Sequence, residues 1–255
     1  MFKNKNILIT GASKGLGREI SIEFKKLGAN LILVARDKKI LEGIVKKDDK
    51  KHMIFHCDLF DPKNIITICE YIKKRLKKID IIVHCLGGSF GINDPMVNWY
   101  QFQKSIYGNL GNAIEFNSQL IPLMIKKGQG NIIHVSSITG LEAIGSVPYV
   151  TSKAAISGYV RSMGNHLSKF GITLCGIVPG AFFGFKNSMS RFKFYKPEEF
   201  KKFSKQLPNS RMPKAKEYLD FIKLVSKKES KIFSGSLVSL DTGQGKTVLQ
   251  NYIDE

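Results

Sequence analysis

The sequence predicts a single α/β domain built on a doubly wound parallel sheet of about seven strands, with helices on both faces. Short apolar runs rich in β-branched residues alternate with longer amphipathic segments, which is the pattern of βαβ units. The 255 residues, 43% of them hydrophobic, suffice for one large core. No shift in composition and no internal repeat divides the chain. We therefore expect one domain over residues 1–255.

Each element is predicted from its own run of residues. Seven runs have the composition of strands: Asn6–Thr10, Asn30–Ala35, His52–Cys57, Ile79–His84, Gly130–Ser136, Ile172–Ile177 and Ser236–Leu240. Helical periodicity is clearest in four segments: Leu16–Leu27, Asn64–Lys77, Trp99–Ile125 and Tyr149–Lys169. Right-handed crossovers between the strands would place the helices on both faces and a ligand at the carboxyl ends of the strands.

The segment from Gly184 to Lys231, between the last two expected strands, departs from this alternation. In and just before it stand several prolines and aromatic residues, among them Pro197, Pro208, Pro213, Phe182, Phe183, Phe185, Phe192, Phe194 and Tyr195. We interpret residues 184–231 as an insertion that forms a lid or substrate loop. The alternative is a surface pair of helices that packs its own aromatic residues.

A glycine-rich turn directly follows the first expected strand and precedes the first helix. It spans Thr10–Gly17 and has the sequence TGASKGLG. Glycines in such a turn let phosphate oxygens approach the N–H groups of a helix N-terminus, where the helix dipole favours anions. The order of strand, glycine loop and helix predicts a dinucleotide site in a Rossmann-type fold. The alternative is an ordinary turn between a strand and a helix.

The end of the second expected strand bears on the choice of dinucleotide. A carboxylate at this point would bind the ribose hydroxyls of NAD(H), but Arg36 stands there. Together with Lys14 on the glycine loop, Arg36 can pair with a 2′-phosphate, so the sequence favours NADP(H) over NAD(H). Alternatively, Arg36 is a solvated residue at the end of a strand.

The chain is strongly basic, with a formal charge of +19. From residue 186 to 231 there are 14 basic and 5 acidic residues, and from 38 to 78 there are 12 and 6. Many lysines lie on helix-like segments, where a solvated surface explains them. If the charge gathers near the active cleft, it predicts an anionic small-molecule substrate. Binding of nucleic acid by the lysine-rich surface is a weaker alternative.

Targeting and cysteine patterns bear on the location of the protein. No apolar run is long enough to span a bilayer and no cleavage signal follows Met1, so we expect a cytoplasmic protein without a membrane span. The cysteines lack both CxxC pairs and histidine spacing: Cys57, Cys69, Cys85 and Cys175. Neither a metal site nor a disulfide framework is predicted.

Tyr149 and Lys153 stand four residues apart in the last long helical segment. In a helix this spacing puts both side chains on one face. A lysine ammonium beside a phenol favours the phenolate, which lowers a pKa that is ordinarily about 10 towards working pH. Such a tyrosine can exchange a proton with a substrate alcohol or carbonyl.

These motifs come in the order found in short-chain dehydrogenases/reductases, which the sequence resembles over nearly its whole length. The motifs that carry the resemblance are, in chain order, TGxxxGxG at Thr10–Gly17, Asp58, Asn109, the pair Ser136-Ser137, YxxxK at Tyr149–Lys153, and Pro179-Gly180. The resemblance implies an oxidoreductase that works as a homodimer or homotetramer built on the long central helices.

The resemblance also implies catalytic roles. Tyr149 would be the general acid in carbonyl reduction and the base in alcohol oxidation, and Lys153 would lower its pKa and bind the nicotinamide ribose. Ser137 would orient the substrate oxygen, and Asn109 would hold a water in a proton relay. The alternatives are a strand-end cap for Ser137 and helix packing for Asn109.

The resemblance further implies a set of cofactor contacts. Besides Arg36, Tyr149 and Lys153, they come from the glycine loop and from the ends of three other strands: Gly11, Ser13, Lys14, Gly15, Leu16, Gly17, Asp58, Leu59, Leu86, Gly87, Pro179 and Gly180.

Three departures from the family pattern limit this transfer. After the fourth strand the family commonly has Asn-Asn-Ala-Gly, whereas this chain has His84-Cys85-Leu86-Gly87, and we interpret His84 as structural. Ser137 precedes Tyr149 by 12 residues, one fewer than is commonest, which leaves Ser136 as an alternative catalytic serine. The threonine that often follows Pro179-Gly180 is absent from Ala181–Gly184.

The sequence therefore predicts an NADP(H)-dependent oxidoreductase that interconverts a carbonyl and a secondary alcohol. The segments around residues 86–89 and 136–149 are most similar to reductases of bacterial surface-carbohydrate biosynthesis, which suggests a sugar phosphate or nucleotide sugar as the substrate. A 3-oxoacyl-carrier-protein reductase is the close alternative. A regulator that senses NADP(H) without turnover is an alternative of another class.

Overall fold

The computed structural model describes residues 1–45, 51–142 and 144–246. In this part of the chain seven parallel strands form one sheet in the order β3-β2-β1-β4-β5-β6-β7. The strands are β1 (Asn6–Thr10), β2 (Asn30–Ala35), β3 (Met53–His56), β4 (Ile81–His84), β5 (Gly130–Val135), β6 (Ile172–Pro179) and β7 (Leu237–Leu240). The predicted doubly wound parallel sheet is confirmed.

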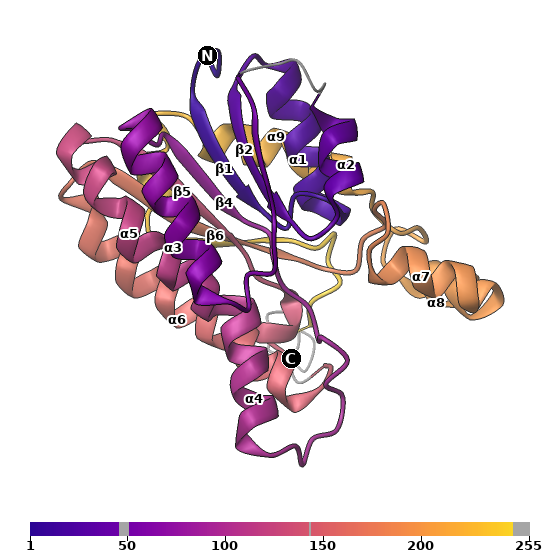
Figure 1. Cartoon of the computed structure of the whole chain (residues 1–255). Helices are drawn as coiled ribbons and strands as arrows, with labels where there is room; N and C mark the ends of the chain where they lie inside the picture. The colour runs from indigo at the N-terminus through magenta and orange to yellow at the C-terminus, as the bar shows by residue number, and fades with distance from the viewer. Residues whose placement is uncertain (46–50, 143, 247–255) are drawn as a thin grey trace.

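Helices cover both faces of this sheet (Figure 1). On one face lie α1 (Gly15–Lys26), α2 (Lys38–Ile44) and α9 (Leu219–Val225). On the other lie α3 (Pro62–Tyr71), α5 (Asn112–Lys127) and α6 (Val147–Ser168). The described residues also form five short helical turns: η1 (Ile72–Leu76), η2 (Tyr107–Gly111), η3 (Ile138–Gly140), η4 (Ala215–Tyr218) and η5 (Ser230–Phe233).

The core forms two layers because successive residues of a strand face opposite sides of the sheet. On β1, Ile7 and Ile9 pack towards α1, whereas Leu8 between them packs towards α5. All three side chains are fully buried, as is Phe116 of α5. Burial of each such side chain contributes about 1.5–3 kcal/mol, so both layers stabilise the central strands.

The long helix expected at Trp99–Ile125 is interrupted. A π-helical turn, η2, separates α4 (Trp99–Ile106) from α5, and α4 extends below the sheet in Figure 1. Turns of this kind widen a helix locally and are frequent at functional sites. Here the turn contains Asn109, one of the predicted catalytic residues.

Residues 184–231 divide into two parts instead of forming a single insertion. Helices α7 (Ser188–Tyr195) and α8 (Pro197–Gln206) project from the body at the right of Figure 1, and the structure buries no residue of either. In contrast, α9 is part of the core through Ile222 and Val225, which are 1% and 0% exposed. The projecting part matches the alternative of a surface helical pair that packs its own aromatic residues.

Candidate active site

The glycine loop joins β1 to α1 at the carboxyl edge of the sheet. Gly11 and Gly15 adopt φ angles of 66° and 50°, which residues other than glycine rarely adopt. A Cβ atom on Gly17 would lie 2.5 Å from the Gly11 carbonyl oxygen. Ser13 and Leu16 are buried beside them and Lys14 is exposed. The loop therefore has the tight glycine turn that the sequence predicts between β1 and α1.

The loop also contacts the segment that follows β6, which was not predicted. The Gly15 N–H donates to the Phe185 carbonyl at 2.7 Å, and the Arg18 guanidinium lies 4.4 Å from the Phe185 ring centroid. A Cβ on Gly184 would lie 3.1 Å from the Gly15 Cα. A glycine within an aromatic run is the only sequence signal of this contact. Residues 184–185 thus form one wall of the phosphate end of the site.

A large groove begins where β2 and β3 end. Its volume is about 780 Å³, and its walls include Arg36, Asp58, Phe60 and Lys104. Arg36 is exposed, and Leu59 beside Asp58 is buried. These are the positions predicted to hold the adenosine half of the cofactor, and the groove continues from them to the aromatic residues of α4.

Asp37, which follows Arg36, is used for another purpose. Its carboxylate accepts a hydrogen bond from the Ile40 N–H at 3.1 Å and caps α2. An aspartate in this role satisfies a free N–H group at a helix start. The carboxylate nearest the end of β2 is therefore engaged, while the Arg36 guanidinium is exposed to the groove.

Tyr149 and Lys153 lie on the first turns of α6 and face the same side. The Lys153 Nζ lies 5.8 Å from the centroid of the Tyr149 ring. Lys153 is 4% exposed, and its ammonium donates to the Val135 carbonyl at 2.9 Å. Helix α6 begins just before them, with Pro148 in its first turn. The predicted pair is therefore formed.

The two adjacent serines at the end of β5 have different surroundings. The Ser136 hydroxyl is buried and donates to the Lys153 carbonyl at 3.2 Å, which ties β5 to α6. The Ser137 hydroxyl accepts from the Thr139 N–H at 3.3 Å and caps η3, which is the alternative role expected for it. The Ser137 and Thr139 hydroxyls also act to lower the pKa of Tyr149, so Ser137 is the serine of the pair that adjoins Tyr149. Thr139 is a member that the sequence reasoning missed.

Asn109 lies next to this group but uses its side chain to hold a loop. Its Oδ1 accepts from the Gly88 N–H at 2.9 Å, and its Nδ2 donates to the Gly88 and Ser105 carbonyls. A Cβ on Gly87 would lie 2.8 Å from Asn109 Oδ1 and 3.0 Å from Lys153 Nζ. Asn109, Gly87 and Lys153 thus meet, while Leu86 touches Gly11 across the β1–β4 crevice.

The pKa shifts in the site follow from burial. Burial raises the pKa of the Tyr149 phenol, and the Ser137 and Thr139 hydroxyls offset only part of this effect. Burial also lowers the pKa of Lys153 to about 8. The lowering of the Tyr149 pKa that the spacing predicts is therefore wrong for this structure. The reason is that removal of the phenol from water outweighs these hydrogen bonds, while the Lys153 ammonium donates to the Val135 carbonyl.

The end of β6 is held by a residue from the far end of the chain. Gln244 Oε1 accepts from the Ala181 N–H at 2.7 Å, and its Nε2 donates to the Ala181 carbonyl at 3.2 Å. A Cβ on Gly180 would lie 2.6 Å from the Gln244 amide carbon. The segment Pro179–Ala181, which lacks the usual threonine, is thus fixed by an amide that sequence reasoning did not identify.

His84 lies in the core and not in the site. Its Nε2 is 3.0 Å from Asn117 Oδ1, and the Asn117 amide donates to the Tyr159 hydroxyl at 3.0 Å and lies 3.4 Å from His134 Nε2. Burial lowers the pKa of His84 to about 4 and that of His134 well below its usual value. These contacts join β4, α5, β5 and α6, as the structural interpretation of His84 predicts.

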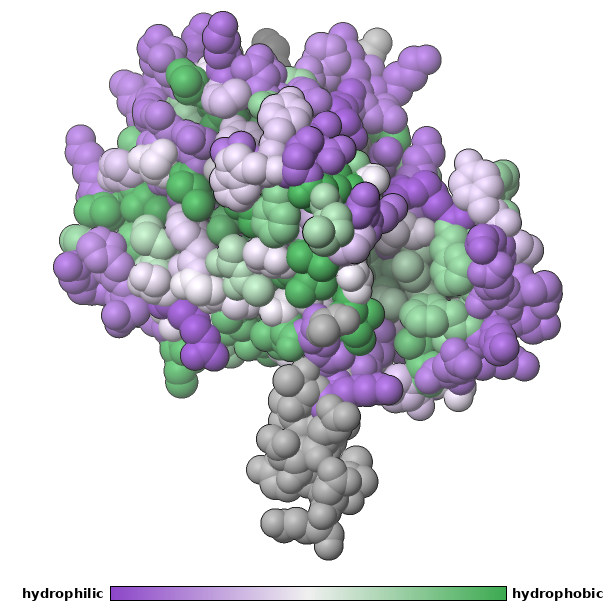
Figure 2. Space-filling model, turned by 90° about the horizontal axis from the view of Figure 1, so that it is seen from below, coloured by the Kyte–Doolittle hydropathy of each residue, from purple (hydrophilic) through white to green (hydrophobic). Residues whose placement is uncertain are grey.

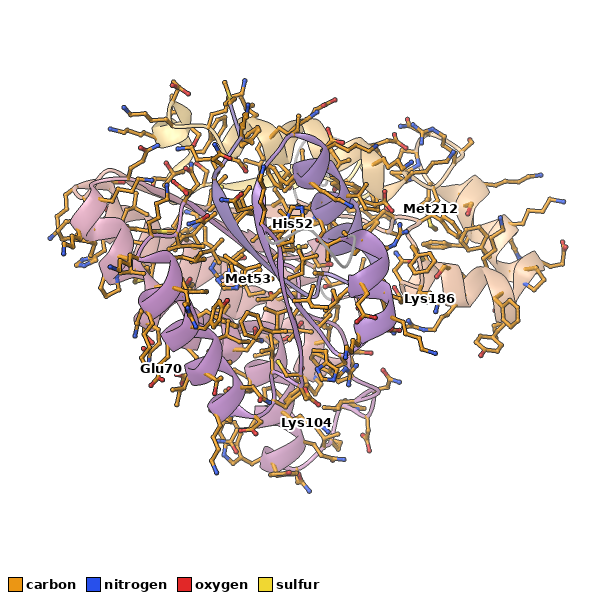
Figure 3. The ribbon with its side chains drawn as sticks, turned by 45° about the horizontal axis from the view of Figure 1, so that its top comes forward. His52, Met53, Glu70, Lys104, Lys186 and Met212 are labelled. Atoms are coloured by element: carbon orange, nitrogen blue, oxygen red, sulfur yellow. The ribbon has the colours of Figure 1, made fainter. Side chains whose placement is uncertain are left out.

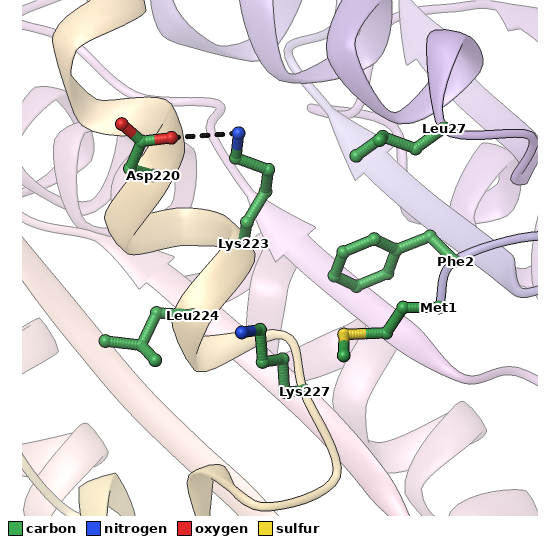
Figure 4. A pocket seen from close by; sticks show the side chains of 7 residues that line it. All are labelled: Met1, Phe2, Leu27, Asp220, Lys223, Leu224 and Lys227. Atoms are coloured by element: carbon green, nitrogen blue, oxygen red, sulfur yellow. Dashed lines mark ion pairs between the residues drawn. The ribbon is translucent and has the colours of Figure 1, made fainter.

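A second cavity of about 410 Å³ lies away from these residues (Figure 4). Leu27, at the end of α1, is one wall, so the cavity lies at the amino edge of the sheet, because α1 leads back to the start of β2. Lys223 points to Asp220 at 2.8 Å in the opposite wall. The cavity holds none of the predicted site residues and is separate from the site.

The residues at the carboxyl edge fit a nicotinamide dinucleotide. Gly11, Gly17 and Gly87 let the glycine loop, the end of β4 and Lys153 pack closely, and the groove at Arg36 and Asp58 lies at the same edge of the sheet. Lys153 and Tyr149 stand at the other end, beyond Gly87. The glycine loop thus lies in the middle of the site, with the basic Arg36 at one end and the proton-exchanging Tyr149 at the other.

The chain is similar to known proteins of one enzyme family. Residues 5–191 match the short chain dehydrogenase family. A fatty acyl-CoA reductase of Acinetobacter baylyi is 31% identical over 181 residues, which are 69% of this chain and 61% of that protein. Dehydrogenase/reductase SDR family member 7 of Mus musculus is 30% identical over 68% of this chain and 54% of its own length. The chain thus spans less than two thirds of these two relatives.

Another relative covers nearly the full length. A 3-oxoacyl-(acyl-carrier-protein) reductase of Buchnera aphidicola is 25% identical over 96% of this chain and 99% of that protein. Among solved structures, L-sorbose reductase from Gluconobacter frateurii, complexed with NADPH and L-sorbose, has a TM-score of 0.86 and 23% identity, and the match covers 96% of this chain and 98% of that one. The structural likeness supports the fold.

Proposed function

The chain belongs to the short-chain dehydrogenase family, and on that premise we propose that it is an NADP(H)-dependent oxidoreductase that interconverts a carbonyl and a secondary alcohol. The observation that carries this proposal is the meeting of Tyr149, Ser137 and Lys153 beyond the glycine loop. Ser137 follows β5, and Tyr149 and Lys153 lie on α6, far along the chain from the glycine loop. All of them nevertheless lie at the carboxyl edge of one sheet.

The chain's own residues supply the proton transfer. Tyr149 donates its phenolic proton to a carbonyl oxygen during reduction and takes it back during oxidation. Ser137 donates a hydrogen bond that orients this oxygen, and Lys153 stabilises the phenolate that remains. A bound nicotinamide would supply or accept the hydride. The raised pKa of Tyr149 keeps the phenol protonated at neutral pH, as a proton donor must be.

NADP(H) is proposed as the cofactor because of the charges at the end of β2. Arg36 is exposed in the groove, and Asp37 is engaged in capping α2. A guanidinium can bind a 2′-phosphate in a bidentate manner, and the Asp37 carboxylate already accepts a hydrogen bond from the Ile40 N–H. Lys14, exposed on the glycine loop, adds positive charge.

Two substrate classes remain in competition. A β-hydroxyacyl or β-ketoacyl thioester is favoured by the relative that matches over nearly the full length, a reductase of an acyl-carrier-protein substrate. A sugar phosphate or nucleotide sugar is the other candidate, favoured by the basic residues around 186–216 and by the fold likeness to a sorbose reductase. Both substrates present a carbonyl or secondary alcohol with an anionic group attached.

A substrate panel tests the proposal. Sugar phosphates, nucleotide sugars and acyl thioesters are offered with NADPH and NADH to the wild type, to Tyr149→Phe and to Tyr71→Phe. We expect Tyr149→Phe to lose about 10²–10⁴-fold in kcat because the proton donor is gone. Tyr71 on α3 is 37% exposed and lines no wall of the groove, so Tyr71→Phe is the matched control and should be fully active.

The results also separate the enzyme from a sensor. Turnover that survives Tyr149→Phe would reject the mechanism. Tight NADPH binding without turnover on any member of the panel would favour a regulator that senses the cofactor. Turnover of one substrate class only would decide between thioesters and sugars.

A further inference from the structure

Helices α7 and α8 form an arm that stands apart from the body (Figure 1). At its base, the Asn187 side chain caps α7 and donates to the Phe182 carbonyl, and Leu207 is buried where α8 ends. Both ends of the hairpin are therefore fixed to the body. The turn between the helices, at Tyr195–Pro197, is its far tip.

The arm has its own aromatic interior, which does not include the tip. The Phe192 ring lies 5.8 Å from that of Phe200 and 6.1 Å from that of Phe203. Lys193 Nζ lies over the Phe183 and Phe200 rings. Phe194 and Tyr195, in contrast, are 79% and 75% exposed, with their rings 5.0 Å apart. The tip thus presents two aromatic side chains that the fold of the arm does not need.

The arm is also strongly basic. Residues 186–216 contain two acidic residues, Glu198 and Glu199, and ten basic ones: Lys186, Arg191, Lys193, Lys196, Lys201, Lys202, Lys205, Arg211, Lys214 and Lys216. Seen from below, hydrophilic residues cover its outer rim (Figure 2). In Figure 3, Lys186 lies at the right, at the base of the arm, and Lys104 of α4 lies at the lower edge of the molecule.

A second exposed aromatic pair lies in a segment with little charge. Trp99 and Tyr100 at the start of α4 are 68% and 77% exposed. Over residues 88–111, however, only Asp94 and Lys104 are charged. Phe194 and Tyr195 therefore lie in a basic setting, whereas Trp99 and Tyr100, which line the groove at Arg36, lie in a nearly neutral one.

We propose that the arm docks on the surface of an anionic lipid bilayer. Phe194 and Tyr195 enter the region between headgroups and acyl chains, where aromatic rings are favoured, and the lysines contact the lipid phosphates. Two adjacent rings at the end of a projecting hairpin reach a flat surface without interference from the body. A folded acidic protein would match the charge but offers no general apolar layer for both rings.

The docking is peripheral. Among the residues that the structure describes, no helix is long and apolar enough to cross a membrane. A few aromatic side chains combined with basic residues give reversible binding that depends on anionic lipid and on salt. This inference does not depend on the chemistry at Tyr149.

Vesicle sedimentation tests the proposal with the full-length protein. Vesicles are made of phosphatidylcholine alone or of phosphatidylcholine mixed with phosphatidylglycerol. We expect binding to the mixed vesicles only, weakened by added salt. Phe194→Ser combined with Tyr195→Ser should lower the affinity about tenfold or more, as should Lys201→Gln, Lys202→Gln and Lys205→Gln together.

Matched controls exclude general effects of charge and hydrophobicity. Trp99→Ser with Tyr100→Ser removes an equally exposed pair, and Lys63→Gln, Lys78→Gln and Lys126→Gln remove three exposed lysines elsewhere. Both controls should bind like the wild type. Circular dichroism melting should show that every variant is folded.

A fluorescence reporter locates the contact. In a Trp99→Phe background, Tyr195→Trp should give a blue-shifted emission with the mixed vesicles, whereas Tyr100→Trp should not shift. The proposal is overturned if the protein does not bind mixed vesicles, if the tip variant binds as tightly as the wild type, or if only the α4 reporter shifts. Binding of duplex DNA that is unaffected by the tip variant, without vesicle binding, would identify a general polyanion surface instead.

Discussion

Arg36 is the single residue on which the choice of cofactor depends. We expect Arg36→Ala to weaken NADPH binding about tenfold or more, because a charge-assisted bidentate pair with the 2′-phosphate is lost. NADH binding should change about twofold or less, since NADH has no such phosphate. Calorimetric titration of both cofactors measures the ratio.

Lys39→Ala is the control for Arg36→Ala. Lys39 is exposed on α2, three residues away, and lines no wall of the groove. Its removal should affect NADPH and NADH equally and slightly. If Arg36→Ala weakens the binding of NADPH and NADH equally, Arg36 does not bind the 2′-phosphate. Arg36 would then be a solvated residue at the end of a strand.

Gly87 makes a second prediction at this scale. Its missing side chain leaves space for Asn109 Oδ1 and Lys153 Nζ, which would lie 2.8 and 3.0 Å from an added Cβ. We expect Gly87→Ala to displace Lys153 and to weaken NADPH binding about tenfold. Gly43→Ala is the control, because no described heavy atom lies within 4 Å of its added Cβ. NADPH affinity that is equal in both variants would contradict the close packing.

Some residues of the site can be predicted from a local sequence pattern, and others cannot. Tyr149 and Lys153 are recognisable because a helical spacing of four places them together, and the glycine loop because its order with strand and helix is diagnostic. Thr139 and Gln244 belong to no such pattern. Gln244 reaches Ala181 across 63 positions of sequence, and only the folded sheet brings the two together. The pKa direction at Tyr149 failed for the same reason, because burial is a property of the fold.

At the scale of elements, α6 contains two glycines in opposite surroundings. A Cβ on Gly158 would meet no described heavy atom within 4 Å, whereas a Cβ on Gly164 would lie 2.2 Å from the Gly235 nitrogen. We expect Gly158→Ala to raise the free energy of unfolding by about 0.5–1 kcal/mol, since alanine favours the helix. Gly164→Ala should lower it by about 2 kcal/mol, because backbone must move.

Urea denaturation of the two variants and the wild type measures this difference. The sign is the decisive result, since both substitutions add one methyl group to the same helix. If Gly164→Ala is as stable as the wild type, α6 does not pack on the backbone at Gly235 as described. If Gly158→Ala is destabilised, that face of α6 is covered by another part of an assembly.

Most strands were predictable because a parallel sheet covered on both faces needs continuous apolar runs, and β1 and β2 begin and end as expected. Helix α2 was missed because its seven residues give too little periodicity, although Asp37 is a good cap. The π-helical turn was missed since the apolar pattern continues through it. The expected insertion at residues 184–231 included α9, which is a short core helix. The prolines and aromatic residues before α9 made the whole segment resemble a loop.

At the scale of the whole molecule, two buried histidines lie at the centre of the sheet. His84 is the last residue of β4 and contacts Asn117 of α5. His134 lies on the neighbouring strand with its ring 4.7 Å from that of His84. Two buried imidazoles must both remain neutral, so this core tolerates basic conditions better than acidic ones.

This arrangement predicts that stability falls in mild acid. The pKa of His84 is about 4 in the folded chain and about 6.5 in the unfolded chain, so below pH 6.5 the unfolded chain binds the extra proton. Stability should be complete above pH 6.5 and should fall as the pH drops towards 4, by on the order of 3 kcal/mol for His84 alone. Burial lowers the pKa of His134 as well, which adds to the loss.

Urea denaturation between pH 7.5 and pH 4.5 measures this loss. His84→Asn removes the titrating group while keeping an amide to bond Asn117, so its unfolding free energy should depend less steeply on pH than that of the wild type. His56→Gln is the control, because His56 is exposed at the end of β3 and should leave the slope unchanged. A wild-type stability that stays constant to pH 4.5 would show that these imidazoles are not buried as neutral groups, and the tie between β4, α5, β5 and α6 would have to be revised.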